Sequence, residues 1–247
     1  ILVQNPPAVP VLIFAYIFSR IRTITQRKKT RFIIDWHNLG YTMLPEGGAR
    51  KLAKIYEQRI APWADGNLCV TMAMKAFLQE NIARNDNVKV LYDCPPSMFQ
   101  PLSLCEQHAI LVKLNDELCS ACPRSWNLPN KAVGETILTT KSSESNHLPR
   151  YGRPALVTSS TSWTEDEDFG LLLDALIELD ERITREKSSL TVLVVVTGTG
   201  PLKSMYEEKM SRLKMSKVAV QTVWLEPADY PRLIGCADVG VSLHTST

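Results

Sequence analysis

The sequence predicts an α/β fold with two domains, each built on a parallel sheet. Short runs rich in β-branched residues alternate with longer stretches of helical periodicity, which is typical of parallel strands joined by crossover helices. The run at 190–196 is continuously apolar, as expected of a strand that is buried on both faces. A polar, aperiodic segment at 123–150 separates the two halves and is predicted to be a linker or a surface insertion.

Composition narrows the class of protein. The 247 residues are 45% hydrophobic and 22% charged, which suits one large or two smaller globular domains and excludes a collagen-like, acidic disordered or disulfide-dense chain. The net charge of +2 gives no overall basic excess, so we expect no nucleic acid partner. The six cysteines lack a framework spacing and are expected to be reduced thiols on a cytosolic face. Because the chain starts with Ile1 rather than Met, we expect it to be a fragment.

The first half, 1–122, is predicted to form the N-terminal domain, with strands at 1–3, 31–34, 68–71 and 88–91 and helices at 49–61 and 72–81. An apolar run at 8–18 is too short to span a bilayer, which takes about 20 such residues. Several cations and no acid follow it between Arg20 and Arg31, a combination that suits the surface of an anionic membrane. The alternative is a buried helix followed by a solvated loop.

The second half, 151–247, is predicted to form the C-terminal domain, with strands at 154–159, 190–196, 218–223 and 239–243 and helices at 169–180, 202–213 and 227–236. Thr164 is expected to cap the first of these helices, with Glu167 completing a capping box. The acidic run at 165–168 also resembles a metal site. Carboxylates at a helix start complement the helix dipole, so we favour the capping role.

Two segments stand at the carboxyl ends of predicted strands, where parallel sheets place their ligands. Asp35 and His37 follow one strand, and a carboxylate beside an imidazole can perform acid–base work or contact sugar hydroxyls. Gly198 and Gly200 lie between a strand and a helix, where backbone N–H groups can contact a phosphate. The alternatives are a hydrogen-bonded loop for the first segment and an ordinary turn for the second. Trp224 can stack on a ligand ring or fill the edge of a core.

Five sequence blocks, taken together and in order, resemble the chitobiosyldiphosphodolichol beta-mannosyltransferases. They cover nearly the whole chain outside the polar segment, and the third block is long and unusual enough to make chance implausible. The blocks are Ile34–Tyr41, Tyr92–Phe99, Ser159–Phe169, Trp224–Pro231 and Ala237–Ser246.

The resemblance implies a GT-B architecture, in which two Rossmann-like domains face each other across a cleft and the second domain holds the sugar nucleotide. Both domains would be incomplete in this chain. The implied activity is inverting β-1,4 transfer of the first mannose from GDP-mannose to the chitobiose of a dolichyl-diphosphate lipid. The implied location is the cytosolic face of the endoplasmic reticulum membrane. The membrane surface and other dolichol-pathway glycosyltransferases are the further partners it suggests.

Site residues follow from the same resemblance. Asp35 and His37 are the candidates for the base and a sugar contact. The candidates around the donor are Ser160, Ser162, Gly198, Gly200 and His244. No cofactor and no metal site are expected, and a metal requirement of the reaction stays open. The chain departs from the family pattern at Cys94, where the family has Arg, and in the loop at 160–163, which lacks the Arg and Lys of related enzymes.

Two other functions remain open at this point. One is a GT-B transferase with another sugar-nucleotide donor, and the other is a truncated, non-catalytic paralogue that binds other glycosylation enzymes. Donor binding without turnover would favour the second. We also expect the isolated fragment to be inactive and prone to aggregation, because an incomplete sheet exposes its strand edges.

Overall fold

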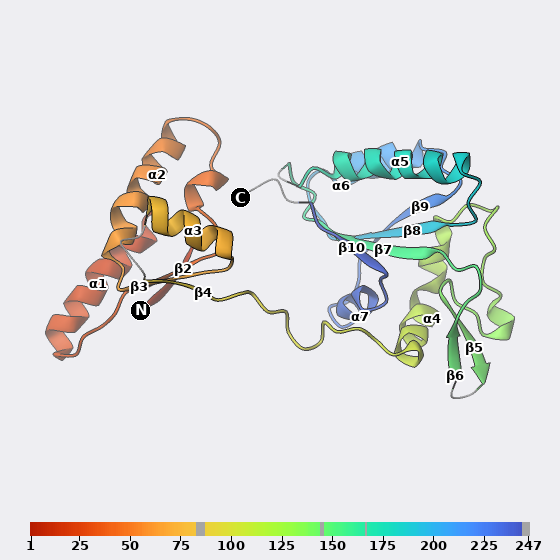
Figure 1. The fold of residues 1–247 in the computed structure, drawn as a ribbon, viewed down its shortest axis with the longest axis horizontal. Coiled ribbons are helices and arrows are strands. Elements are labelled where there is room, and N and C mark those ends of the chain that lie inside the picture. Colours follow the sequence, from red (N-terminus) through yellow and green to blue (C-terminus); the bar gives the residue numbers. More distant parts are fainter. Residues whose placement is uncertain (83–86, 144–145, 166, 244–247) are drawn as a thin grey trace. The chain divides into compact units, whose positions relative to one another are not determined.

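Parallel sheets form the centre of both units of the chain (Figure 1), as the computed structural model shows for residues 1–82, 87–143, 146–165 and 167–243. The units are Ile1–Cys94 and Pro95–Thr245. The predicted α/β class with two parallel sheets is therefore confirmed. That both sheets are incomplete stays a prediction.

The first unit has a four-stranded sheet in the order β1-β2-β3-β4, with every strand parallel to its neighbour. The strands are β1 (Leu2–Asn5), β2 (Ile33–Trp36), β3 (Gly66–Cys69) and β4 (Val88–Val90). The helices are α1 (Val11–Gln26), α2 (Gly48–Ile60) and α3 (Met72–Asn81), with 3-10 turns η1 (Gly40–Met43) and η2 (Ala61–Trp63). Asn5 pairs with Trp36, and Trp36 pairs with Cys69, so three strands end at the same edge.

Helix α1 carries apolar side chains that do not join the core of its unit. Leu12 is fully buried in that core, whereas Phe14, Ile17, Phe18 and Ile21 are between 44% and 65% exposed. The helix is thus packed on one side and apolar on its exposed side, so neither of the two alternatives predicted for this run describes it completely. No helix among the described residues combines the length and the apolar content needed to cross a bilayer.

The second unit has a four-stranded parallel sheet in the order β10-β7-β8-β9. Its strands are β7 (Ala155–Ser160), β8 (Val192–Thr197), β9 (Val218–Val223) and β10 (Val239–Val241). Its helices are α4 (Leu104–Ser120), α5 (Phe169–Arg185), α6 (Lys203–Ser211) and α7 (Tyr230–Ile234), with a short 3-10 turn η3 (Lys131–Val133) and an antiparallel hairpin of β5 (Thr139–Ser143) and β6 (Asn146–Pro149).

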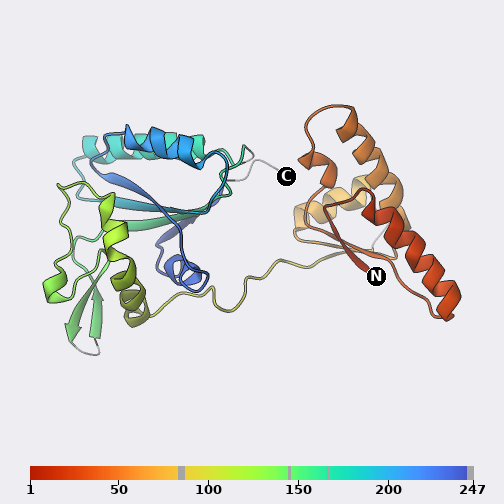
Figure 2. The same ribbon diagram turned by 180° about the vertical axis from the view of Figure 1, so that it is seen from behind.

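Helices cover both faces of this second sheet, α5 and α6 on one side and α4 and α7 on the other (Figures 1 and 2). Strand β8 shows how the sequence achieves this. Val194 and Val196 pack into the core beneath α5 and α6, whereas Leu193 and Val195 pack into the core beneath α4 and α7. The prediction that this strand is buried on both faces is confirmed.

The boundary between the units lies earlier than the predicted N-terminal domain of 1–122. The first unit ends at Cys94, and α4 belongs to the second unit, where Leu111 and Leu118 join its core. The predicted linker at 123–150 also packs there, because Trp126 and Ile137 are buried in the same core. A few large apolar side chains anchor this segment, although its average composition is polar.

Candidate functional site

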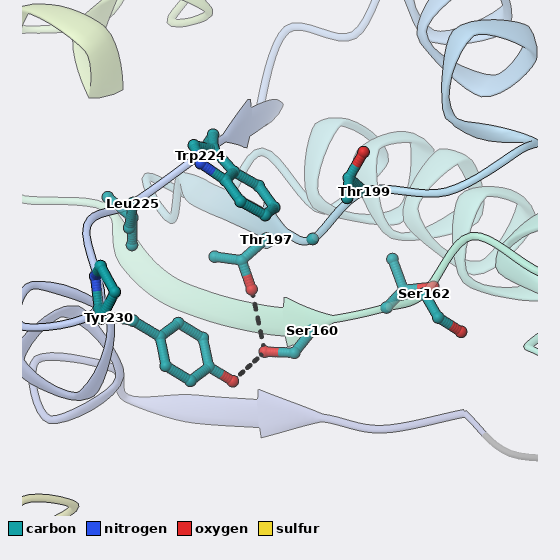
Figure 3. Close-up of a pocket in the computed structure, with 10 residues that line it drawn as sticks. Ser160, Ser162, Thr197, Thr199, Trp224, Leu225 and Tyr230 are labelled. Atoms are coloured by element: carbon teal, nitrogen blue, oxygen red, sulfur yellow. Dashed lines mark hydrogen bonds between the residues drawn. The ribbon is translucent and has the colours of Figure 1, made fainter.

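A cavity of about 550 Å³ opens at the carboxyl edge of the second sheet (Figure 3). Strands β7 and β8 end beside it, and the residue after β9 lies in its wall. Parallel sheets bind ligands at this edge, where the loops between strands and helices diverge. The cavity wall includes three of the predicted donor-binding residues, Ser160, Ser162 and Gly198. His244 lies outside the described residues.

Hydroxyl groups form a connected row in the cavity wall. The Thr197 hydroxyl donates to Ser160 Oγ over 3.0 Å, and Ser160 Oγ lies 2.8 Å from the phenol oxygen of Tyr230 (Figure 3). Tyr230 begins α7, and its ring makes an edge contact with Phe99, with ring centroids 5.8 Å apart. Such hydroxyls can donate to and accept from the oxygens of a sugar or a phosphate. Thr197 and Tyr230 are not among the predicted site residues, although Tyr230 lies within a family block.

Gly198 and Gly200 bring two loops into backbone contact. Gly198 has φ +113°, and a Cβ atom there would lie 1.9 Å from the Thr161 carbonyl oxygen. A Cβ atom at Gly200 would lie 1.7 Å from the Ser162 carbonyl oxygen. No side chain can be accommodated at such distances, so both glycines are needed for the loops to meet. Gly200 is not one of the residues that line the cavity, and its contact is with the backbone of Ser162, which does line it.

The loop at 160–163 is held by Glu167 and Trp163. Glu167 Oε2 accepts from the Thr161 hydroxyl at 2.5 Å and from the Ser162 N–H at 2.6 Å. Hydrogen bonds to a carboxylate are stronger than those between neutral groups, so this residue fixes the loop firmly. Trp163 is fully buried and packs on the Phe169 ring, with centroids 4.6 Å apart.

The predicted capping box at Thr164 and Glu167 is wrong. Helix α5 begins at Phe169, and its N-cap is Asp168, whose side chain accepts from the Gly170 N–H. Glu167 is instead directed at the preceding loop. The sequence does contain the Thr and Glu of a capping box. Asp168, however, is a second hydrogen-bond acceptor closer to the apolar helix, and it forms the N-cap instead.

Trp224 is one of the residues that line the cavity (Figure 3), and 69% of its surface is exposed. Of the two predicted alternatives, the core position is therefore excluded. An exposed indole beside polar groups provides a flat surface on which a nucleotide base can stack, a contact typically worth about 1–3 kcal/mol.

Formal charge is scarce around this cavity. Its lining includes no Lys or Arg among the residues that the structure describes. Within the same described part of the chain, no group of three His, Cys, Asp or Glu side chains is placed to hold a metal ion.

The second candidate site lies in the first unit, at the carboxyl end of β2. His37 Nε2 lies 3.2 Å from Asp35 Oδ2, and His37 Nδ1 lies 3.7 Å from Asp93 Oδ2. The structure thus brings together the two predicted residues and adds a third. Asp93 was missed as a site residue, although it lies in the Tyr92–Phe99 block, because only the fold brings the segment after β4 close to His37 at the end of β2.

Exposure and anchoring make this group suitable for chemistry. The His37 and Asp35 side chains are 33% and 21% exposed, so they are accessible to a substrate but are held by surrounding residues. Between them in the chain, Trp36 is fully buried and its indole N–H donates to Asn67 Oδ1 at 2.8 Å. This bond ties β2 to β3 and fixes the strand end. A carboxylate that contacts an imidazole is an arrangement that can orient the ring and accept a proton.

Several curated glycosyltransferases are similar in sequence to the whole of this chain. It is 41% identical over 268 residues to a protein named UDP-glycosyltransferase TURAN of Arabidopsis thaliana, covering all of this chain and 56% of that protein. It is 38% identical over 257 residues to the human chitobiosyldiphosphodolichol beta-mannosyltransferase, covering all of this chain and 53% of that protein. No family model matches the chain.

Among solved structures, the catalytic domain of starch synthase IV from Arabidopsis thaliana, bound to ADP and acarbose, has a TM-score of 0.48 and 10% identity, over 93% of this chain and 49% of that one. The mouse and Candida albicans beta-mannosyltransferases are 37% and 35% identical, again over the whole of this chain. The resemblance in the sequence blocks is therefore confirmed: this chain is a relative of the chitobiosyldiphosphodolichol beta-mannosyltransferases and spans about half the length of the curated relatives it matches.

Proposed function

We propose that the chain is part of an inverting β-1,4-mannosyltransferase of the dolichol pathway. Its second unit would bind GDP-mannose, and its first unit would supply the base that activates the chitobiose acceptor on a dolichyl-diphosphate lipid. Identity of 32–38% to curated beta-mannosyltransferases over the whole chain supports this function. The observation that carries it is the cavity with Ser160, Tyr230 and Trp224 at the carboxyl edge of the second sheet.

The cavity suggests how a sugar nucleotide would be held. The Trp224 indole would stack on the base, while the hydroxyls of Ser160 and Tyr230 would bond to oxygens of the diphosphate or the sugar. Backbone N–H groups of Gly198 and Thr199, which follow β8 and line the cavity, would add donors to the phosphates. No metal or cofactor is part of this proposal.

Inversion requires one displacement. The acceptor hydroxyl oxygen forms a bond to the anomeric carbon of mannose. The bond from that carbon to the diphosphate oxygen breaks, and its electron pair stays on the diphosphate oxygen. The hydroxyl proton passes to a base. Asp35 is our candidate for the base, and His37 is our candidate for a sugar contact. GDP leaves with the charge that develops on its terminal phosphate.

The decisive experiment measures donor binding by calorimetry to the full-length protein that contains this chain. Trp224→Ala should weaken binding of GDP-mannose about tenfold, as expected for the loss of one stacked base. Tyr151→Ala is the matched control, because Tyr151 is 95% exposed in the same unit and does not line the cavity. Equal affinity in wild type and Trp224→Ala would contradict the proposed donor site.

A second candidate is a transferase that uses a different donor, because one relative is named a UDP-glycosyltransferase. The same calorimetric experiment with UDP-glucose and UDP-N-acetylglucosamine decides between the donors. Tighter binding of a UDP-sugar than of GDP-mannose would favour the second candidate. Binding of GDP-mannose without turnover would favour a non-catalytic paralogue that acts within the glycosylation machinery.

The exposed face of α1 supports contact with a membrane surface, which in this proposal is the cytosolic face of the endoplasmic reticulum membrane. Phe14 and Phe18 are 65% and 56% exposed, and the cations from Arg20 to Arg31 follow on the same segment. Apolar side chains that enter the headgroup region beside cations are typical of a helix lying on an anionic bilayer. Phe18→Asp should reduce flotation of the 247-residue chain with phosphatidylserine vesicles, whereas Leu171→Asp, on the exposed side of α5, should not. Equal flotation of both variants would contradict this location.

A further inference from the structure

Glu57 carries a buried carboxyl group beside the loop from Trp36 to Tyr41. This loop contains His37 and is called the candidate catalytic loop. It lies in α2 and is 0% exposed. Its Oε1 accepts from the Tyr41 N–H at 2.9 Å, and the Gly40 N–H also bonds to the carboxyl group. A Cβ atom on Gly40 would lie 2.7 Å from Oε1, so only glycine allows this approach. Glu57 therefore holds the backbone of the turn that follows Asn38.

Asn5 links this carboxyl group to the segment that carries His37. The Asn5 carbonyl oxygen accepts from the N–H groups of His37 and Asn38, at 2.9 and 3.3 Å. The Asn5 side-chain Nδ2 donates to the Asn38 carbonyl oxygen at 3.2 Å. Asn5 is fully buried, and its side-chain amide contacts the Glu57 carboxyl group. Glu57 and Asn5 thus fix successive parts of the loop from Trp36 to Tyr41.

Two oxygens in this arrangement need a donor. Glu57 Oε2 and Asn5 Oδ1 are both buried, and neither has a hydrogen-bond partner among the described residues. The Asn5 amide cannot be turned round without losing the bond from Nδ2 to Asn38. A proton on Glu57 Oε2 would give both oxygens a partner, because Oε2–H can donate to Asn5 Oδ1 while Oε1 still accepts from the backbone. An ionised Glu57 would leave both oxygens without a donor, which is costly in a buried site.

The electrostatic surroundings agree with this protonation. Burial raises the pKa of Glu57 to about 7, and this effect outweighs the hydrogen bonds from Tyr41, Asn5 and Gly40, which lower the pKa. From the β1–α1 segment it meets Asn5 and Ala8, which carry no charge. From η1 it meets Tyr41, whose own pKa is raised by burial and by the Glu57 charge and lowered by Arg50. None of these groups places a cation against the Glu57 carboxyl group.

We propose that Glu57 is a positioning residue for the candidate catalytic loop, and that it acts as a neutral acid whose Oε2–H donates to Asn5 Oδ1. The hydrogen bonds fix the backbone at 37–41 and thereby the place of the His37 ring. The catalytic consequence rests on the proposed function, whereas the protonated contact itself does not.

The test compares Glu57→Gln with Glu57→Ala by amide hydrogen exchange of residues 37–41, at pH 5.5 and 8.5. The Gln amide accepts at Oε1 and donates from Nε2 at either pH, so it reproduces the neutral acid. Because the folded-state pKa is raised above the ordinary value of 4.5, the stabilisation from the proton is present in full below about 4.5 and is lost as the pH rises through about 7. Wild-type protection factors should therefore fall at least tenfold between the two pH values, while Glu57→Gln keeps them and Glu57→Ala lacks them at both.

Glu80→Gln is the matched control, since Glu80 is exposed on α3 and should change nothing. Protection in Glu57→Gln as low as in Glu57→Ala, or pH-independent protection in wild type, would overturn the proposal.

Turnover in the full-length protein adds an independent readout. Wild-type kcat should decline above pH 7 more steeply than kcat of Glu57→Gln, with little change in donor KM. Normal kcat in Glu57→Ala, despite lost protection, would overturn the positioning role. Absence of mannosyl transfer in every variant, with the predicted exchange pattern, would contradict the proposed function and leave the protonated contact supported.

Discussion

The two candidate sites occupy corresponding places in two similar sheets but differ in their chemistry. At the end of β2, His37 lies between two carboxylates, with contacts of 3.2 and 3.7 Å. At the ends of β7 and β8, the described cavity lining consists of hydroxyl-bearing side chains, glycine backbone and the side chains of Trp224, Leu225 and Pro227, with no Lys or Arg among them. The sheet edge provides the place for a site in both units. The few residues after each strand determine the chemistry of the site. In the first unit they can transfer a proton, and in the second unit they form an uncharged binding surface.

The supports of the two sites differ in the same sense. In the first unit, buried polar side chains fix the loop, through Asn5 and Glu57. In the second unit, close backbone packing fixes it, since Gly198 and Gly200 leave no room for a Cβ atom. The first site should therefore respond mostly to changes of charge, and the second mostly to changes of shape.

The largest expected effect tests the role of charge in the first site. Asp35→Asn keeps the shape of the side chain but removes its capacity to accept a proton. If Asp35 is the base, turnover in the full-length protein should fall about 10³-fold, as expected for the loss of general base catalysis. Donor affinity measured by calorimetry should not change, because the donor cavity lies in the other unit.

Asp93→Asn is the matched comparison for that experiment. The Asp93 side chain is 72% exposed and lies 3.7 Å from the ring, so solvent screens most of its influence on His37. Its effect on turnover should be much smaller. Near-normal turnover of Asp35→Asn would rule out the assignment of the base.

The next effect in size tests the role of shape in the second site. At Gly200, alanine would bring its Cβ within 1.7 Å of the Ser162 carbonyl oxygen, so the two loops must separate. We expect a loss of about 2–3 kcal/mol in the free energy of unfolding, the usual cost of overpacking, and a measurable loss of donor affinity. Urea denaturation and calorimetry provide the two measurements. Gly240→Ala, in β10 with nothing within 4 Å, should leave both values unchanged. Equal stability of the two variants would show that the loop contact is not tight in solution.

Strong local patterns made most of the fold predictable. The β8 segment could be placed because continuous apolar residues have few alternatives to a buried strand. The start of α5 could not, because Thr164 and Asp168 both offer an N-cap and only packing of Phe169 decides between them. The membership of α4 in the second unit was equally hidden, since its apolar side chains fit a core without specifying which.

The candidate sites show the same limit at the level of single residues. Asp35 and Ser160 could be identified because each stands at a strand end, a position that sequence reveals. Asp93 and Tyr230 reach their sites only through tertiary structure, across separations of 56 and 70 residues in the chain. Glu57 was concealed in another way, because a single acid on an amphipathic helix normally faces solvent.

The smallest expected effect refines the neutral character of the second site. Tyr230→Phe removes the phenol oxygen that lies 2.8 Å from Ser160 Oγ but keeps the ring contact with Phe99. The proposed bond from this hydroxyl to the donor, if neutral, contributes about 1 kcal/mol, so donor affinity should fall about fivefold. Tyr16→Phe, in the first unit, is the control, since the Tyr16 hydroxyl has no hydrogen bond to the described residues. A loss of two orders of magnitude or more in Tyr230→Phe would mean that the hydroxyl meets a charged group of the ligand, because hydrogen bonds to charged groups are the stronger class. Binding at the second site would then depend on the charge of the ligand, whereas the first site depends on charged side chains of the protein. The two sites would differ in where the charge comes from, and not in whether charge matters.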